Sequence, residues 1–289
     1  MSENITHTGV TDDCRRLLLH DGRVSTAFKE ALADQHEIVR LGGIRRRGAE
    51  FVEDLLDLYR DAWPGGDRRE LLGQKIGFVL GWLFHRAADL QMKPVFRAAD
   101  PDCPHSPTDC SVYHDVYVFR AVYGSGGVEP YPQESILRTP GEDVDRLEDL
   151  VRALLQRALI GLHTLIPDHE DVDGWLDRLI GLRQRWRVDV ERYAQAFSDP
   201  DPDMVQRFIE DINFYDPADD IVRLARSVQE GRPADIALDD ALQAAEDGSH
   251  YAQALRRGVL YALAADRYFL GEIGPEEFRT DLEMSNPLQ

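Results

Sequence analysis

Residues 77–94 read GFVLGWLFHRAADLQMKP, and this stretch indicates how the chain folds. It combines small glycine and alanine residues with tryptophan, phenylalanine and leucine, which is typical of a helix that is buried on most of its sides. A polar side chain on such a helix needs a hydrogen-bond partner or a metal ion. His85 and Asp89 lie four residues apart and therefore project from the same face. The pair can share one ligand or one proton, or form a hydrogen bond within the packed helix.

Most of the remaining chain also repeats its apolar residues at intervals of three and four, and strand-like alternation is almost absent. This periodicity predicts an all-α protein with a single helical domain over 1–289. Two stretches, 97–108 and 123–139, break the rhythm with proline and glycine, and we expect them to be loops. The predicted helices are 10–20, 23–40, 44–62, 68–92, 109–123, 142–165, 170–197, 201–213, 217–229, 235–246, 248–271 and 275–284.

The charge balance limits the classes of partner. The 289 residues include 53 acidic and 33 basic side chains, which give a formal net charge of -20. Such a charge repels phosphate backbones and anionic membranes at long range, so general nucleic-acid binding is not expected. No apolar run approaches the roughly 20 residues of a membrane-spanning helix, and three cysteines do not make a disulfide framework. We expect a cytoplasmic protein that is not embedded in a membrane. Homo-oligomer formation stays open, because the apolar helix at 249–271 suits a bundle centre or a dimer seam.

Residues 81–94 resemble the buried helix of the zinc-dependent phospholipase C superfamily, which is related in fold to the single-strand-specific zinc nucleases. That helix reads approximately G-[FY]-[IL]-x-H-x-x-x-D-x-x-x-H-P. The present chain keeps the glycine, the His85–Asp89 pair and Pro94, whereas Lys93 stands in the place of the final histidine. The resemblance implies a multi-helix bundle of the zinc-dependent phospholipase C-like type.

Other segments within about the first 125 residues are similar to the same family. Thr6-His7 resembles the Thr-His with which family members open, and residues 38–43 resemble the family's F-x-L-G-[AS] turn. His114 lies where the histidine of an H-x-x-x-E helix falls, but Val118 occupies the position of its glutamate. An arginine-rich stretch stands where the family has a Pro-Asp pair. Residues 140–289 supply further packed helices.

The resemblance implies a metal site with His7, His85, Asp89 and His114 as ligands. Three or four ligands suffice for one ion, which would be zinc or another divalent transition metal. Lys93 places an ammonium group where a metal ligand stood, which disfavours a second cation but allows contact with a phosphate or with Asp89. The expected catalytic residues are Asp89, which ligates the ion or accepts a proton from water, and Lys93, which contacts a non-bridging phosphoryl oxygen.

A competing metal pattern lies in the loop before His114. Cys103, His105, Cys110 and His114 offer thiolate and imidazole donors at short spacing, which is what a closed structural zinc site needs. The spacing matches no common zinc-binding framework, and an ordinary polar loop is the alternative.

Two function classes follow from these patterns. The first is a metal-dependent hydrolase that acts on a small-molecule phosphoester through a metal-activated water. The second is a non-catalytic helical interaction or binding protein with a degenerate phospholipase C-like pocket. The retained His85–Asp89 pair favours the first class, and the missing family ligands favour the second.

Overall fold

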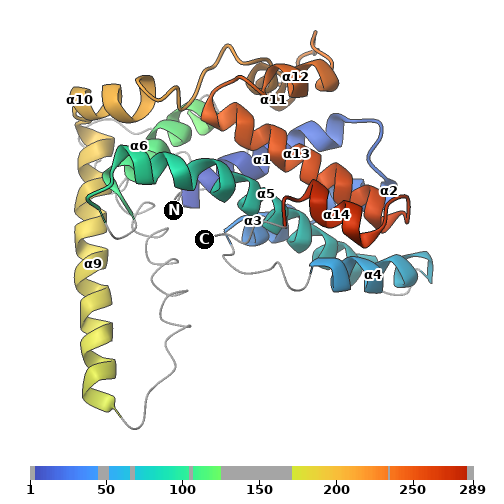
Figure 1. Ribbon diagram of the computed structural model, residues 1–289, viewed down its shortest axis with the longest axis horizontal. Coiled ribbons are helices and arrows are strands. Elements are labelled where there is room, and N and C mark those ends of the chain that lie inside the picture. Colours follow the sequence, from blue (N-terminus) through green and yellow to red (C-terminus); the bar gives the residue numbers. More distant parts are fainter. Residues whose placement is uncertain are drawn as a thin grey trace.

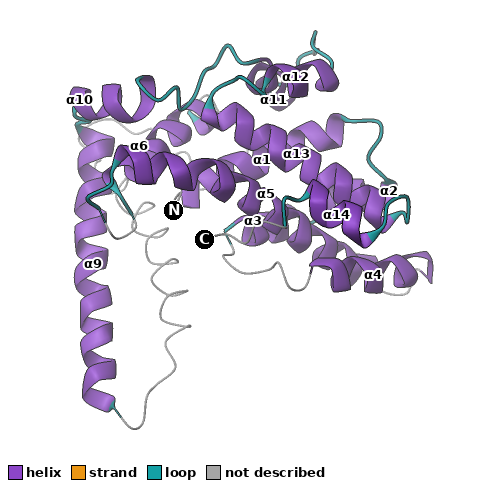
Figure 2. Ribbon diagram, viewed as in Figure 1, coloured by secondary structure: helices purple, strands orange, loops and turns teal. Residues whose placement is uncertain are grey.

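The regular structure of this protein is helical wherever the computed structural model describes it (Figures 1 and 2). This finding confirms the prediction of an all-α bundle. No helix in these parts of the chain is both long enough and apolar enough to cross a membrane. The predicted helix at 142–165 lies outside the described residues. The structure describes residues 4–44, 52–65, 69–103, 107–124, 171–233 and 235–284.

The α-helices of the described residues range from 4 to 31 residues in length. Within the described residues, short 3-10 or π turns lie at Trp63–Gly65, Phe119–Tyr123 and Gln206–Glu210. The α-helices are α1 (Asn4–His20), α2 (Thr26–Asp34), α3 (His36–Gly43), α4 (Val52–Ala62), α5 (Arg69–Ala99), α6 (Asp109–Val118), α9 (Val172–Ser198), α10 (Pro202–Val205), α11 (Asp220–Gln229), α12 (Leu238–Ala244), α13 (His250–Phe269) and α14 (Pro275–Asp281).

Helices α1 and α5 form the centre of the bundle. Helix α5 packs against α1, α2, α3, α4 and α13, and in Figure 1 it runs through the middle of the molecule. Every residue of α1 from 5 to 14 is buried, so this part of the helix is enclosed on all sides. Polar side chains on the buried parts of the two helices, such as His7, His85 and Asp89, therefore lie in the protein interior, where each needs a partner.

The first turn of α1 is capped by a carboxylate from a distant helix. Asp115 on α6 accepts hydrogen bonds from the backbone N–H groups of Ile5 and Thr6, at 3.4 and 2.7 Å, and from the Thr6 hydroxyl at 2.6 Å. The Oδ2 atom of Asp115 also accepts a hydrogen bond from the Tyr193 hydroxyl of α9, at 2.8 Å. The carboxylate satisfies donors that a helix start leaves without intrahelical partners. Helix α1 thus begins at Asn4 rather than at the predicted residue 10, and His7 lies inside it.

Other predicted boundaries also differ from the structure. The single helix expected over 23–40 is split into α2 and α3 at Gln35, whose φ of -115° and ψ of 37° are not helical. The helix expected over 68–92 continues to Ala99, with Pro94 inside it. Packing of these helices against their neighbours, which local sequence patterns do not encode, accounts for such differences.

Backbone contact joins α3 to α5. A Cβ atom added to Gly81 would lie 1.9 Å from the carbonyl oxygen of Val39, and one added to Gly42 would lie 2.3 Å from the carbonyl oxygen of Phe78. Both helices need glycine at this crossing, because any side chain would push the backbones apart. The close approach brings the end of α3 next to the part of α5 that carries His85.

A candidate metal centre between α1 and α5

Three buried side chains meet at the interface of α1 and α5. His7 comes from α1, and His85 and Asp89 come from adjacent turns of α5. The two imidazole rings stack with their centroids 4.2 Å apart, and one ligand atom from each of the three residues lies within 4.8 Å of the others. Within the described ranges, this is the one group of three or more His, Cys, Asp or Glu side chains that lie close enough to hold one metal ion.

The separations in this group are longer than those of good hydrogen bonds and are compatible with metal ligation. His7 Nε2 lies 3.4 Å from Asp89 Oδ1, and His85 Nε2 lies 3.3 Å from Asp89 Oδ2. A good N–H···O hydrogen bond measures about 2.9 Å, whereas a tetrahedral zinc ion with ligands at about 2.0–2.1 Å holds them roughly 3.4 Å apart. His85 Nε2 and Asp89 Oδ1 are buried without a hydrogen-bond partner in the described part of the chain. A divalent cation would satisfy both atoms.

A backbone carbonyl at the end of α3 orients His85. The Nδ1 atom of His85 lies 3.1 Å from the carbonyl oxygen of Gly43. Because a carbonyl only accepts, Nδ1 carries the proton, and in the neutral ring Nε2 then has a lone pair directed at the cluster. Histidines that ligate metals commonly donate their second N–H in this way.

Lys93 supports the carboxylate of Asp89 from the next turn of α5. Its Nζ lies 2.9 Å from Asp89 Oδ2, in the pairing that the sequence allowed. The ammonium group thus occupies one carboxylate oxygen and leaves Oδ1 for a further partner. The side chain of Lys93 is 22% exposed, against 4% for Asp89, so Lys93 is the more solvent-accessible member of the pair.

The electrostatics give His7 and Asp89 the protonation states that a metal requires. Burial, together with the neighbouring His85, lowers the pKa of His7 to about 4, so its ring is neutral at pH 7. Burial alone would raise the pKa of Asp89, but the polar contacts with His7 and His85 hold it well below its usual range. The cluster therefore presents an ionised carboxylate beside a neutral imidazole, as a divalent transition ion prefers.

His114, the fourth expected ligand, lies elsewhere. Its Nε2 donates to the carbonyl oxygen of Phe208 at 2.8 Å, and its ring stacks on Phe214 with centroids 3.6 Å apart. The structure thus brings together three of the four sequence-derived ligands and places His114 in an aromatic part of the core. Burial lowers the pKa of this histidine to about 3.

His114 should make the protein less stable in mild acid. The pKa of His114 is about 3 in the folded protein and 6.5 in the unfolded chain, so the unfolded chain takes up this proton first as the pH falls. The free energy of unfolding is therefore unaffected by His114 above pH 6.5 and decreases as the pH falls toward 3. Between pH 8 and pH 5 the free energy of unfolding should fall by about 2 kcal/mol on account of this residue. Urea denaturation of the wild type and of His114→Phe, which keeps an aromatic ring on Phe214, should show this difference in pH dependence. Parallel pH profiles for the two proteins would contradict it.

In its described part, the cysteine loop brings together Cys110 and His114, whose Sγ and Nε2 atoms lie 3.5 Å apart, but no group of three possible ligands. Burial raises the pKa of Cys110 to about 12, which makes it a protonated thiol. The thiol of Cys103 lies 4.0 Å from the carbonyl oxygen of Pro107. His105, the other residue of that pattern, lies outside the described residues.

Sequence reasoning missed the role of Gly43. The atom involved is a backbone carbonyl oxygen, which every residue carries, so no residue type marks it. The available signal was the Gly42-Gly43 pair itself, which indicates a close backbone approach.

No known protein family, no curated protein and no solved structure matches this chain. The chemistry of the buried cluster is therefore the basis for assigning a function.

Proposed function

We propose that this protein is a metal-dependent hydrolase of phosphoesters with a helical bundle of the zinc-dependent phospholipase C-like type. One divalent transition ion, with zinc as the first choice, would be held by His7, His85 and Asp89. The observation that carries the proposal is the convergence of two imidazole rings and one carboxylate from two helices. His7 Nε2 lies 3.4 Å from Asp89 Oδ1, His85 Nε2 lies 3.3 Å from Asp89 Oδ2, and one ligand atom from each residue lies within 4.8 Å of the others.

The number of ligands suits a catalytic ion rather than a closed structural one. Structural zinc sites commonly have four protein ligands, whereas catalytic sites have three and keep a position open. When bound, such an ion supplies a Lewis acid that polarises a phosphoryl oxygen and lowers the pKa of water. Asp89 is better suited to ligation than to proton acceptance, because its pKa lies well below the usual range.

Lys93 supplies the element of the site that favours a phosphoester. Its side chain is 22% exposed, and its ammonium group lies 2.9 Å from the Asp89 carboxylate of the buried cluster. A positive charge at this place attracts an anionic substrate and can donate to a non-bridging oxygen. The same charge disfavours a second cation beside the first, which supports a mononuclear site.

The burial of the cluster favours a second candidate function. His7, His85 and Asp89 are each at most 5% exposed, so a metal ion could serve only to hold α1 against α5. In that case the protein would be a non-catalytic helical interaction or binding protein with a degenerate phospholipase C-like pocket.

Hydrolysis assays with Lys93 variants separate the two functions. We expect the zinc-loaded protein to hydrolyse p-nitrophenyl or bis(p-nitrophenyl) phosphate. Replacement of Lys93 by methionine should lower kcat/KM by about 100-fold, the size of effect seen when one stabilising donor is removed. Lys93→Arg keeps the charge and should retain most of the activity. The metal content of each variant is the control, and a fully loaded wild type that hydrolyses neither ester would favour the non-catalytic function.

A further inference from the structure

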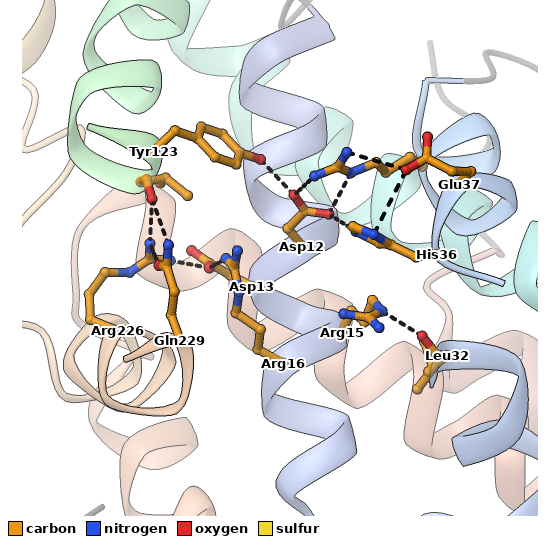
Figure 3. A network of polar contacts seen from close by, with 12 residues as sticks. Asp12, Asp13, Arg15, Arg16, Leu32, His36, Glu37, Tyr123, Arg226 and Gln229 are labelled. Carbon is orange, nitrogen blue, oxygen red and sulfur yellow. Dashed lines mark hydrogen bonds and ion pairs between the residues drawn. The ribbon is translucent and has the colours of Figure 1, made fainter. Parts of the chain in front are cut away.

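A buried ion-pair network ties α3 to α1 close to the candidate metal centre (Figure 3). At its centre is Asp12 of α1, which is 1% exposed. Its carboxylate accepts hydrogen bonds from Arg40 at 2.7 and 3.0 Å, from His36 Nε2 at 2.9 Å and from the Tyr123 hydroxyl at 2.9 Å. His36 and Arg40 belong to successive turns of α3, so one carboxylate holds the whole N-terminal half of that helix.

The carboxylate of Asp12 is ionised at neutral pH. Burial alone would raise its pKa, but hydrogen bonds from His36 and Arg40 hold it well below the usual range. Charge-assisted hydrogen bonds are stronger than hydrogen bonds between neutral groups. The Arg40 guanidinium donates two of them to Asp12, which fixes its orientation as well as its distance.

The other end of α3 contacts His85 and α1. A Cβ atom on Gly43, the last residue of α3, would lie 2.3 Å from Thr11 Oγ1, so the helix end rests directly on α1. The carbonyl oxygen of the same glycine accepts the hydrogen bond from His85 Nδ1. Arg40 lies only one turn before this carbonyl. A rigid helix therefore connects the Asp12 carboxylate to the group that orients His85.

We propose that Asp12 is a positioning residue of the metal centre, which acts through Arg40 and α3 on the Gly43 carbonyl and thereby on the orientation of His85. The inference rests on the proposed metal site and deepens it. Partners of metal ligands outside the coordination shell commonly change metal affinity by 10- to 100-fold when they are removed. We expect an effect of this size from Asp12, although its side chain touches none of the three ligands in the contacts described.

Asp13 provides a matched control on the same helix. It is as buried as Asp12, and its carboxylate also accepts charged and hydroxyl donors. These donors are Arg16 at 2.6 Å, the Tyr251 hydroxyl at 2.9 Å, and Arg226. Arg226 lies on α11 and Tyr251 on α13, so the contacts of Asp13 lead to helices other than α3 (Figure 3). Loss of Asp13 should disturb the core without moving the Gly43 carbonyl.

The test is a Co²⁺ titration of the full-length wild type, Asp12→Asn and Asp13→Asn, followed by the ligand-field absorption of the bound ion. We expect Asp12→Asn to weaken binding at least 10-fold and to change the spectrum, because His85 is no longer held in one orientation. Asp13→Asn should bind within about threefold of the wild type with an unchanged spectrum. Circular dichroism checks that each variant is folded, and Arg40→Gln replaces Asp12→Asn if the latter does not fold.

Each other outcome overturns a specific step. Equal losses of affinity in the Asp12 and Asp13 variants would mean that both act only by loosening the core, which overturns the positioning role. Wild-type affinity and spectrum in Asp12→Asn would overturn it as well, while leaving the metal centre intact. A wild type that binds no Co²⁺ would overturn the metal centre and the positioning role together.

Discussion

Replacement of Gly81 by alanine is expected to lower the free energy of unfolding by about 3 kcal/mol, the upper part of the range for overpacking a protein interior. The new methyl carbon would lie 1.9 Å from the carbonyl oxygen of Val39 and 2.8 Å from the amide nitrogen of Gly43. Both are backbone atoms, so no side chain can rotate away, and α3 as a whole must move from α5. The measurement is urea denaturation followed by circular dichroism.

Gly73 is the matched control for this prediction. It lies on the same helix and is buried, but a Cβ atom there would meet only Gln35 Cγ, at an ordinary contact distance of 3.7 Å. Gly73→Ala should therefore leave stability unchanged or raise it by up to about 1 kcal/mol through helix propensity. Equal stability of the Gly81 and Gly73 variants would contradict the backbone contact between α3 and α5. Because Gly43 also orients His85, Gly81→Ala should weaken metal binding as well.

Helix content could be predicted from the sequence because it depends on local patterns. The apolar intervals of three and four predicted the all-α fold, and the four-residue spacing of His85 and Asp89 was enough to place both on one face. The structure brings these two side chains within 3.3 Å of each other. Helix ends were less predictable, since the start of α1 depends on Asp115, a cap more than 100 residues away in the chain.

Which residues form the candidate site depends on contacts between segments that are far apart in the sequence. No spacing rule relates His7 to α5, and only the family resemblance placed it beside His85. The same resemblance suggested His114, but the Phe208 carbonyl and the Phe214 ring engage that histidine. Gly43 contributes a backbone atom, and Asp12 acts across α3, so neither role follows from the identity of the residue. Such features become visible only when the helices are packed.

Removal of two ligands from α5 is expected to abolish metal binding. His85→Ala/Asp89→Ala deletes one nitrogen donor and the carboxylate, and His7 alone cannot hold an ion in competition with water. The double variant also removes the Asp89 partner of Lys93 and the His85 donor to the Gly43 carbonyl, so circular dichroism must show that it is folded before its metal content is compared. His114→Phe is the control, because the structure places His114 apart from the cluster. That variant should keep its metal.

The most direct test of the metal centre is elemental mass spectrometry of these proteins, purified without tag histidines or chelators, incubated with zinc and freed of excess ion. The proposed site predicts about one zinc per chain in the wild type and in His114→Phe, and less than about one tenth of an ion in His85→Ala/Asp89→Ala. A wild type without metal, or a double variant that retains it in full, would contradict the assignment of His7, His85 and Asp89 as a metal site.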